Sequence, residues 1–388
     1  MKKQVILKRN EEQRILKGHM WVFSNEIASV EGDPKPGDIV ELVTQSGKFL
    51  GLCFYQPHSL ITCRILTSEH EEINFEFFEK RITKALELRR KLYPGSETYR
   101  LVHGESDFLP GLIIDKYNEF IAIQALTLGM ELRTKLICDV LESIFHPKAI
   151  VARNDVQIRA LENLPIDKKI LRGNHGITIF DDENVKFEID VLQGQKTGFY
   201  LDQRENRKSI HRYAKDCNVL DCFCNEGGFG LHALYAKARS VTAFDISDYA
   251  ISKTKVNMKL NSMIINVETA DAYEKLRSFV SEKKLFDMVI LDPPAFTKSK
   301  RNVKSAMYGY LSINKLALKI IQPEGYLVTS SCSHHISVDD FLSVIEKASV
   351  KAGRYLQLLE LRGAAPDHPV IPYMPETKYL KFAIFKVK

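Results

Sequence analysis

The chain has 388 residues, of which 45% are hydrophobic and 27% charged, and its formal net charge is +6. The length predicts two or three domains, and the composition is that of an ordinary globular protein rather than a fibrous or disordered one. No window approaches the ~18 apolar residues of a membrane span, and the first residues hold too short an apolar run for a secretory signal, so we expect a cytoplasmic protein without a membrane partner.

Residues 1–72 predict a small β-rich domain. Turn-forming sequences such as Gly32-Asp33-Pro34 and Ser46-Gly47 separate short apolar runs, which is the pattern of consecutive strands. The predicted strands are Gln4–Leu7, Asp38–Val43, Phe49–Tyr55 and Leu60–Leu66. Between the first two strands we expect a loop or short helix that contains Trp21.

Residues 73–190 predict a middle α+β domain. Apolar residues recur at near-helical spacing from Phe75 to Tyr93, with basic residues between them, so this segment is expected to be an amphipathic helix. A second helix is expected over Met130–Ile144. The strand-like runs around it are Gly111–Asp115, Phe120–Gln124 and Lys148–Ala152.

Residues 191–388 predict a Rossmann-like α/β domain with a mostly parallel sheet, because strand-like runs alternate with helical segments. The runs are Asn218–Cys222, Val241–Asp245, Asn266–Glu268, Met288–Asp292 and Tyr326–Ser330. The last two strands, Tyr355–Leu361 and Tyr379–Val387, are joined by a Pro-rich loop rather than a helix. We therefore expect an antiparallel pair to close one edge of the sheet.

Acidic side chains lie at or near the ends of the first three strands of this sheet, as Asp221, Asp245 and Asp271. Ligands of open α/β sheets lie beyond the carboxyl ends of the strands. The turn after Asp221 contains Gly227 and Gly228, which permit positive φ and close backbone approach at a helix N-terminus. Asp245 is suited to the two hydroxyls of a ribose, and Asp271 to an adenine amino group. The sequence therefore predicts a site for an adenosine ligand.

Glu226 helps to choose between two such ligands. A dinucleotide site typically has a G-x-G-x-x-G turn around a pyrophosphate, and Glu226 beside the glycines would repel that group. S-adenosylmethionine carries a cationic sulfonium instead. We therefore favour S-adenosylmethionine as the cofactor.

A carboxylate and two prolines follow the fourth strand, as Asp292-Pro293-Pro294. This stiff turn suits a flat, hydrogen-bonding ring, on which Phe296 could stack. The basic residues that come next would suit phosphate contacts, although such runs are commonly just solvated surface. The predicted RNA-binding residues are Phe296, Lys298, Lys300, Arg301 and Lys304.

These stretches resemble the class I S-adenosylmethionine methyltransferases, and more closely the RlmI-type family of large-subunit ribosomal RNA 5-methylcytosine methyltransferases. The residues that carry the resemblance are 104–113, 195–207, 221–230, 292–296 and 330–335. With a front domain that resembles a PUA RNA-binding domain, the likeness covers nearly the whole chain. It implies a seven-stranded sheet with an antiparallel edge in the last domain, and RNA as the partner.

The resemblance also implies cofactor contacts from the acidic strand ends and the glycine-rich turn, with two residues in support at the methionine carboxylate. The cofactor residues so implied are Asp221, Phe223, Asn225, Gly227, Gly228, Asp245, Ile246, Asp271, Ala272, Asp292, Tyr200 and Arg204. Asn225-Glu226 departs from the family, in which smaller or hydroxylated residues are expected before the paired glycines.

Methylation of cytosine carbon 5 requires a thiolate that adds to carbon 6. Cys332 follows the strand expected beside that of Asp292, and the resemblance assigns it as the nucleophile. His334 or His335 could help to form the thiolate, and Asp292 could support charge on the ring. The seven cysteines are odd in number and lack framework spacing, so we expect reduced thiols and no metal site. Cys222 and Cys224 are less plausible nucleophiles.

Two alternatives stay open. The Asp-Pro-Pro-aromatic motif also occurs in enzymes that methylate base nitrogens, for which Cys332 would be incidental. The chain could instead be a non-catalytic RNA-binding ribosome assembly factor with a vestigial cofactor fold. A homodimer is also left open.

Overall fold

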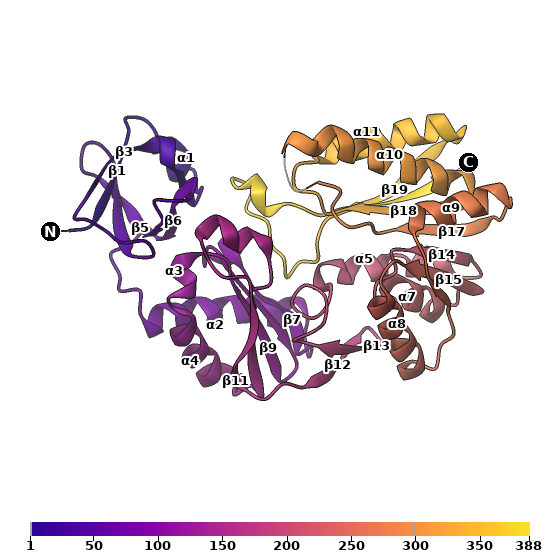
Figure 1. The fold of residues 1–388 in the computed structure, drawn as a ribbon, viewed down its shortest axis with the longest axis horizontal. Helices are drawn as coiled ribbons and strands as arrows, with labels where there is room; N and C mark the ends of the chain where they lie inside the picture. Colours follow the sequence, from indigo (N-terminus) through magenta and orange to yellow (C-terminus); the bar gives the residue numbers. More distant parts are fainter. Residues whose placement is uncertain (1, 298–299) are drawn as a thin grey trace. The chain divides into compact units, whose positions relative to one another are not determined.

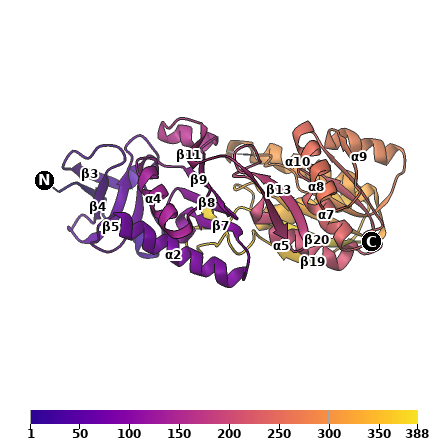
Figure 2. The same ribbon diagram turned by 90° about the horizontal axis from the view of Figure 1, so that it is seen from below.

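The computed structural model describes residues 2–297 and 300–388, which form two compact units (Figures 1 and 2). Unit 1 comprises Met1–Phe180, Ile189–Leu201 and Pro366–Thr377, and unit 2 comprises Asp181–Glu188, Asp202–Ala365 and Lys378–Lys388. The chain therefore passes between the units five times. The division into three domains at residues 72 and 190 stays a prediction.

Unit 1 begins with a six-stranded sheet in the order β2-β6-β5-β4-β1-β3. Its elements are β1 (Gln4–Leu7), α1 (Gln13–Leu16), β2 (Trp21–Phe23), the 3-10 helix η1 (Ser24–Glu26), β3 (Ile27–Glu31), β4 (Ile39–Val43), β5 (Phe49–Tyr55) and β6 (Ile61–Thr67). The four predicted strands are present within one residue. Trp21 lies in a strand rather than in the predicted loop or short helix, and the edge strand β3 was not predicted because most of its side chains are exposed.

A second sheet of unit 1 has the order β11-β10-β9-β8-β7. Its strands are β7 (Thr98–His103), β8 (Leu112–Tyr117), β9 (Phe120–Ala125), β10 (Ala149–Arg153) and β11 (Lys168–Gly173). The accompanying helices are α2 (Phe75–Leu92), α3 (Leu128–Glu131) and α4 (Thr134–Phe145), with the 3-10 helices η2 (Gly104–Asp107) and η3 (Gln157–Glu162). In place of the single helix predicted over Met130–Ile144, the structure has the two helices α3 and α4. At the break between them, the Arg133 guanidinium donates to the carbonyl oxygens of Gly37 and Gly129.

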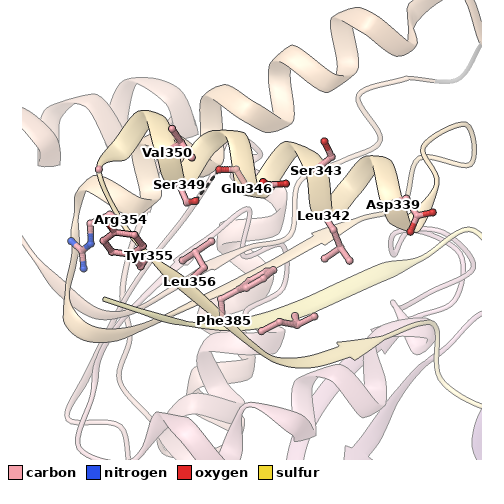
Figure 3. A pocket seen from close by; sticks show the side chains of 12 residues that line it. Asp339, Leu342, Ser343, Glu346, Ser349, Val350, Arg354, Tyr355, Leu356 and Phe385 are labelled. Atoms are coloured by element: carbon pink, nitrogen blue, oxygen red, sulfur yellow. Dashed lines mark hydrogen bonds between the residues drawn. The ribbon is translucent and has the colours of Figure 1, made fainter.

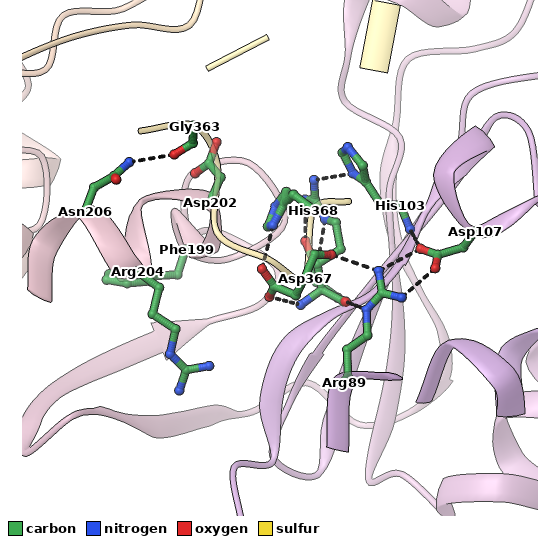
Figure 4. Close-up of polar contacts among 12 residues, drawn as sticks. Arg89, His103, Asp107, Phe199, Asp202, Arg204, Asn206, Gly363, Asp367 and His368 are labelled. Atoms are coloured by element: carbon green, nitrogen blue, oxygen red, sulfur yellow. Dashed lines mark hydrogen bonds and ion pairs between the residues drawn. The ribbon is translucent and has the colours of Figure 1, made fainter. Parts of the chain in front are cut away.

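The segment 366–377 joins unit 1 although it lies near the end of the chain. Arg89, fully buried in α2, donates to both carboxylate oxygens of Asp107 and to the backbone oxygen of Asp367 (Figure 4). Asp367 in turn accepts from the backbone N–H of Arg100 over 2.9 Å. Further along the segment, Met374 is fully buried in the core of the six-stranded sheet. Residues made late in the chain thus complete the packing of unit 1.

Unit 2 is built on a seven-stranded sheet in the order β16-β15-β14-β17-β18-β20-β19. The strands are β14 (Asn218–Cys222), β15 (Ser240–Asp245), β16 (Asn266–Thr269), β17 (Phe286–Leu291), β18 (Ile321–Ser331), β19 (Leu356–Arg362) and β20 (Lys381–Val387). Strands β14 to β18 pair in parallel, and β20 runs antiparallel to both β18 and β19. The predicted α/β fold with an antiparallel edge is confirmed.

Helices cover both faces of this sheet (Figure 1). Helices α9 (Ala272–Ser281), α10 (Val303–Lys319) and α11 (Val338–Ala352) pack on one face and form the main apolar core of the unit with it. The other face carries α5 (Arg204–Ser209), α7 (Gly228–Tyr235) and α8 (Asp248–Leu260), and α6 (His211–Ala214) follows α5. A hairpin of β12 (Ile177–Asp182) and β13 (Val185–Asp190) precedes them, and short 3-10 turns lie at η4 (Leu201–Gln203) and η5 (Lys300–Asn302). A further 3-10 turn, η6 (Pro375–Thr377), belongs to the segment 366–377 of unit 1. None of the helices in the described ranges is long and apolar enough to cross a membrane.

Candidate active site

The glycine-rich turn between β14 and α7 has an unusual backbone. Phe223 and Asn225 adopt positive φ values of 63° and 48°, and Gly227 has a φ of 81°. Residues other than glycine uncommonly adopt positive φ, so the surrounding structure must hold the backbone of this turn in place. Asp245 Oδ2 accepts from the Asn225 N–H over 3.0 Å, and Thr254 Oγ1 donates to the Asn225 carbonyl over 2.8 Å. The end of β15 and helix α8 therefore fix the shape of the turn.

Asp221 is fully buried beneath this turn. Its Oδ2 accepts from the Gly230 N–H over 2.8 Å, whereas its Oδ1 has no hydrogen-bond partner among the described residues. Burial, with the nearby charges of Asp292 and Asp245, raises the pKa of Asp221 to about 8. A buried carboxyl that lacks one partner and faces two other carboxylates suits a cationic ligand. S-adenosylmethionine, with its sulfonium and amino groups, fits this arrangement.

Two further acidic residues lie where their strands end. Asp245 Oδ1 accepts from the Ser247 N–H over 3.0 Å, and Asp271 caps α9 by accepting from the Glu274 N–H over 3.0 Å. The residue after Asp245, Ile246, is 73% exposed. Such an exposed apolar side chain beside the predicted adenosine site is suited to contact a flat ring. Ala272, predicted with them, is buried in the first turn of α9.

Asp292 directly follows β17, and two side chains fix its position. Its Oδ1 accepts from Gln203 Nε2 over 2.9 Å and from the hydroxyl of Ser330. Gln203 is itself oriented by Asn206, whose Nδ2 donates to its Oε1 over 2.6 Å, and the same Nδ2 reaches the Gly363 carbonyl (Figure 4). The sequence did not indicate a role for Gln203 or Ser330, although both lie in the stretches that carry the family resemblance.

Cys332 lies beside the same turn. Its sulfur is 4.0 Å from the carbonyl oxygen of Pro293, and the residue is half-buried. The other six cysteines, all within the described ranges, are buried. Burial raises the pKa of Cys222 and Cys224 well above the ordinary value, which disfavours the reactive thiolate form. The structure thus brings Cys332 and the Asp292-Pro293 turn together.

The predicted RNA-binding residues are described only in part. The Phe296 ring packs against Tyr310 of α10, with 4.5 Å between the ring centres. Arg301 in η5 and Lys304 in the first turn of α10 are exposed. Lys298 and the side chain of Lys300 lie outside the described residues. The predicted contacts with phosphates therefore stay predictions.

The two residues predicted at the methionine carboxylate belong to different units. Arg204 is buried, and its Nε lies 3.2 Å from Asp182 Oδ1 (its side chain is drawn in Figure 4). The Nε of Arg207 lies 2.8 Å from the other oxygen of Asp182. Tyr200 belongs to unit 1, where the Lys196 ammonium lies 4.2 Å from its ring centre. The structure shows Arg204 as part of a buried ion cluster, and the cofactor roles of Arg204 and Tyr200 stay predictions.

Two grooves lie away from these residues. One, of about 710 Å³, runs between α11 and β19 and is lined by apolar residues such as Leu342, Leu356 and Phe385 (Figure 3). The other, of about 800 Å³, lies in unit 1 and includes Lys80, Lys84 and Phe108. None of the described residues predicted for the cofactor or the nucleophile lines either groove.

Comparison with known protein families agrees with the geometry. Residues 172–383 match the S-adenosylmethionine-dependent methyltransferase family, and residues 5–68 match a PUA-like domain. The chain belongs to this methyltransferase family. The cofactor is therefore S-adenosylmethionine, as predicted from the acidic strand ends and the glycine-rich turn.

Full-length relatives and solved structures extend this result. The chain is 40% identical over 397 residues to ribosomal RNA large subunit methyltransferase I of Pseudoalteromonas atlantica, and the match covers 100% of both chains. It is 38% identical to the enzyme of the same name from Vibrio parahaemolyticus, over 99% of both chains. Among solved structures, SMU.776, which was crystallised in complex with SAH, has a TM-score of 0.86 at 18% identity over 100% of each chain. This last likeness concerns the fold.

Proposed function

We propose that the chain transfers a methyl group from S-adenosylmethionine to carbon 5 of a cytosine in large-subunit ribosomal RNA. The observation that carries the proposal is the position of Cys332, whose sulfur lies 4.0 Å from the Pro293 carbonyl in the turn that Asp292 begins. A half-buried thiol beside this turn meets the need of cytosine carbon 5 for a covalent nucleophile. The names of the full-length relatives support ribosomal RNA as the substrate.

In the proposed reaction, the Cys332 thiolate adds to carbon 6 of the cytosine and forms a carbon–sulfur bond. The electron pair of the 5,6 double bond moves so that carbon 5 becomes nucleophilic. Carbon 5 then bonds to the methyl group that S-adenosylmethionine would supply, the sulfur–methyl bond breaks, and S-adenosylhomocysteine is the leaving group. A base then removes the carbon 5 proton, the double bond forms again, and Cys332 leaves as the thiolate. Asp292, held by Gln203 and Ser330, would lie against the ring during addition and stabilise its charge.

The RNA would be held by other parts of the chain. The PUA-like domain over residues 5–68 is the proposed anchor for structured RNA, and the exposed Arg301 and Lys304 are proposed phosphate contacts. A base within a helix must be extruded before Cys332 can reach it, so unpaired RNA is the favoured substrate. A ribosomal RNA substrate agrees with the predicted cytoplasmic location. The comparisons do not support a homodimer, which forms no part of the proposal.

A covalent trap tests the proposal. RNA that contains 5-fluorocytidine keeps a fluorine where the carbon 5 proton must leave, so the protein–RNA bond formed by Cys332 should persist. We expect a denaturation-resistant complex with the unchanged protein and none with Cys332→Ala. Cys138→Ala, which removes a buried thiol in unit 1, is the matched control and should still form the complex.

The product distinguishes the remaining alternatives. Bisulfite mapping of ribosomal RNA from cells with and without the protein should reveal a cytosine that depends on it. Retained turnover by Cys332→Ala, with the methyl group on a base nitrogen, would instead establish an RNA N-methyltransferase. The match of residues 172–383 to the S-adenosylmethionine-dependent methyltransferase family disfavours the assembly factor.

A further inference from the structure

A buried lysine lies next to the residue that follows Cys332. Lys381 on β20 pairs with Ser331 of β18 across the antiparallel ladder, and it is only 3% exposed. Its ammonium donates to the Ser333 carbonyl over 2.6 Å and to the Tyr379 carbonyl over 2.7 Å. These two bonds hold a positive charge against the loop that carries the thiol.

An ion pair with an acidic residue does not account for the buried ammonium of Lys381. No carboxylate of the described residues lies within ion-pair distance of its ammonium, and burying an unpaired charge is unfavourable. Burial lowers the pKa of Lys381 to about 8, while the charge of a Cys332 thiolate acts in the opposite direction. The lysine and the thiolate therefore stabilise each other's charged forms.

We propose that Lys381 is a positioning residue that keeps Cys332 in the thiolate form through the charge of its ammonium. This inference rests on the proposed function, in which Cys332 is the nucleophile. The thiol proton leaves to water, and Lys381 keeps its own proton throughout. The role predicted from the sequence for His334 or His335 thereby passes to Lys381 on β20.

The other titratable groups around Cys332 do not supply this charge. Desolvation, Lys381 and His335 all lower the pKa of His334 below its ordinary value, which disfavours the charged form of this imidazole. Burial also raises the pKa of Tyr310 on α10, and its hydroxyl is 3.1 Å from the Ser333 hydroxyl. Asp292, on the neighbouring turn, is an acid and opposes a thiolate. Of the described groups that the packing elements direct at the loop, Lys381 is the buried cation.

The test measures the thiol itself. Lys381→Gln keeps N–H donors for the two carbonyl oxygens and removes the charge, and Lys381→Arg restores the charge. We would measure the rate of iodoacetamide alkylation of the Cys332 peptide against pH by mass spectrometry. The midpoint should rise by one unit or more in Lys381→Gln, with alkylation at pH 7 about tenfold slower, and Lys381→Arg should return it towards the original value.

Turnover should follow the same shift, because Lys381→Gln would recover activity at higher pH whereas a purely structural loss would lower activity at every pH. An unchanged alkylation midpoint in Lys381→Gln overturns the inference. If that variant does not fold, the unchanged protein still tests the inference. An alkylation midpoint of Cys332 at or above the ordinary thiol value of about 8.5 would contradict the inference. Failure of the proposed function would appear separately, as turnover that survives Cys332→Ala.

Discussion

The side-chain amide of Gln203 donates to Asp292 Oδ1 over 2.9 Å and so joins the turn before α5 to the turn after β17. Gln203→Leu should lower kcat about 10- to 100-fold, because a hydrogen bond to a charged group contributes roughly 1.5–3 kcal/mol. The KM for S-adenosylmethionine should change little. Steady-state kinetics with Gln357→Leu, an exposed residue of β19, as the control would check this; an equal loss in both variants would contradict it.

The pKa of Asp221 predicts a pH-dependent affinity for the cofactor. In the free protein this pKa is raised to about 8, so the carboxyl is mostly protonated at pH 7. A cationic ligand favours the ionised form, so binding should release close to one proton and tighten as pH rises towards 8. Calorimetry in buffers of different ionisation enthalpy measures this proton. Asp221→Asn should abolish the release, and equal heats in all buffers for the unchanged protein would refute the prediction.

The buried ion cluster around Asp182 predicts that the substitution Asp182→Asn will strongly lower the stability of the protein. Burial alone would raise the pKa of Asp182, but Arg207, His232 and Arg204 reverse this and hold it well below the usual range. Asp182→Asn leaves two buried guanidinium groups without their carboxylate, which should cost about 3–5 kcal/mol of unfolding free energy. Urea denaturation measures this loss, and Asp181→Asn, on the exposed neighbour, should have little effect.

The same pKa fixes how this contribution depends on pH. Since the pKa of Asp182 is lower in the folded protein than its ordinary value of 3.8, the stabilisation is fully present above about pH 4–5. It is lost as pH falls towards the folded-state pKa. The difference in stability between Asp182→Asn and the unchanged protein should therefore shrink on acidification.

Alanine substitutions at Gly227 and Gly353 distinguish the effect of backbone strain from damage to the cofactor site. Both have positive φ, but a Cβ at Gly227 would lie 2.9 Å from Thr254 Cγ2, whereas one at Gly353 meets nothing within 4 Å. Each alanine substitution should cost about 1–2 kcal/mol of stability. Only Gly227→Ala should also lose the rise in melting temperature that S-adenosylmethionine produces. Equal responses to the cofactor in both variants would argue against the proposed role of the turn.

Much of unit 2 could be predicted because its central strands are continuous apolar runs bounded by acidic or turn residues. Strands β14 and β15 lie within one residue of the predicted ranges. The edge strands β3 and β11 escaped prediction because their side chains are largely exposed and show no apolar alternation. Arg133, at the break between α3 and α4, donates to the Gly37 carbonyl, a contact that no local pattern reveals.

The residues of the candidate site likewise include some that could be predicted from the sequence and some that could not. Asp292 and Cys332 could be placed together because each follows one of two neighbouring parallel strands, β17 and β18. Gln203 and Lys381 could not, because their positions depend on tertiary contacts and on the register of β20 against β18. Arg204 was predicted from resemblance as a cofactor residue, and only the coordinates reveal its contact with Asp182.

The burial of Met374 in the core of the six-stranded sheet affects how the protein is made. Domains generally fold as the ribosome releases them, beginning from the N-terminus. Here the six-stranded sheet lacks a core side chain until residue 374 has been made, and Arg89 lacks the Asp367 carbonyl until residue 367 has been made. The core of this sheet is thus completed only after residues 202–365 of unit 2 have been made, and a nascent chain arrested before residue 366 would expose that unfinished core to chaperones and proteases.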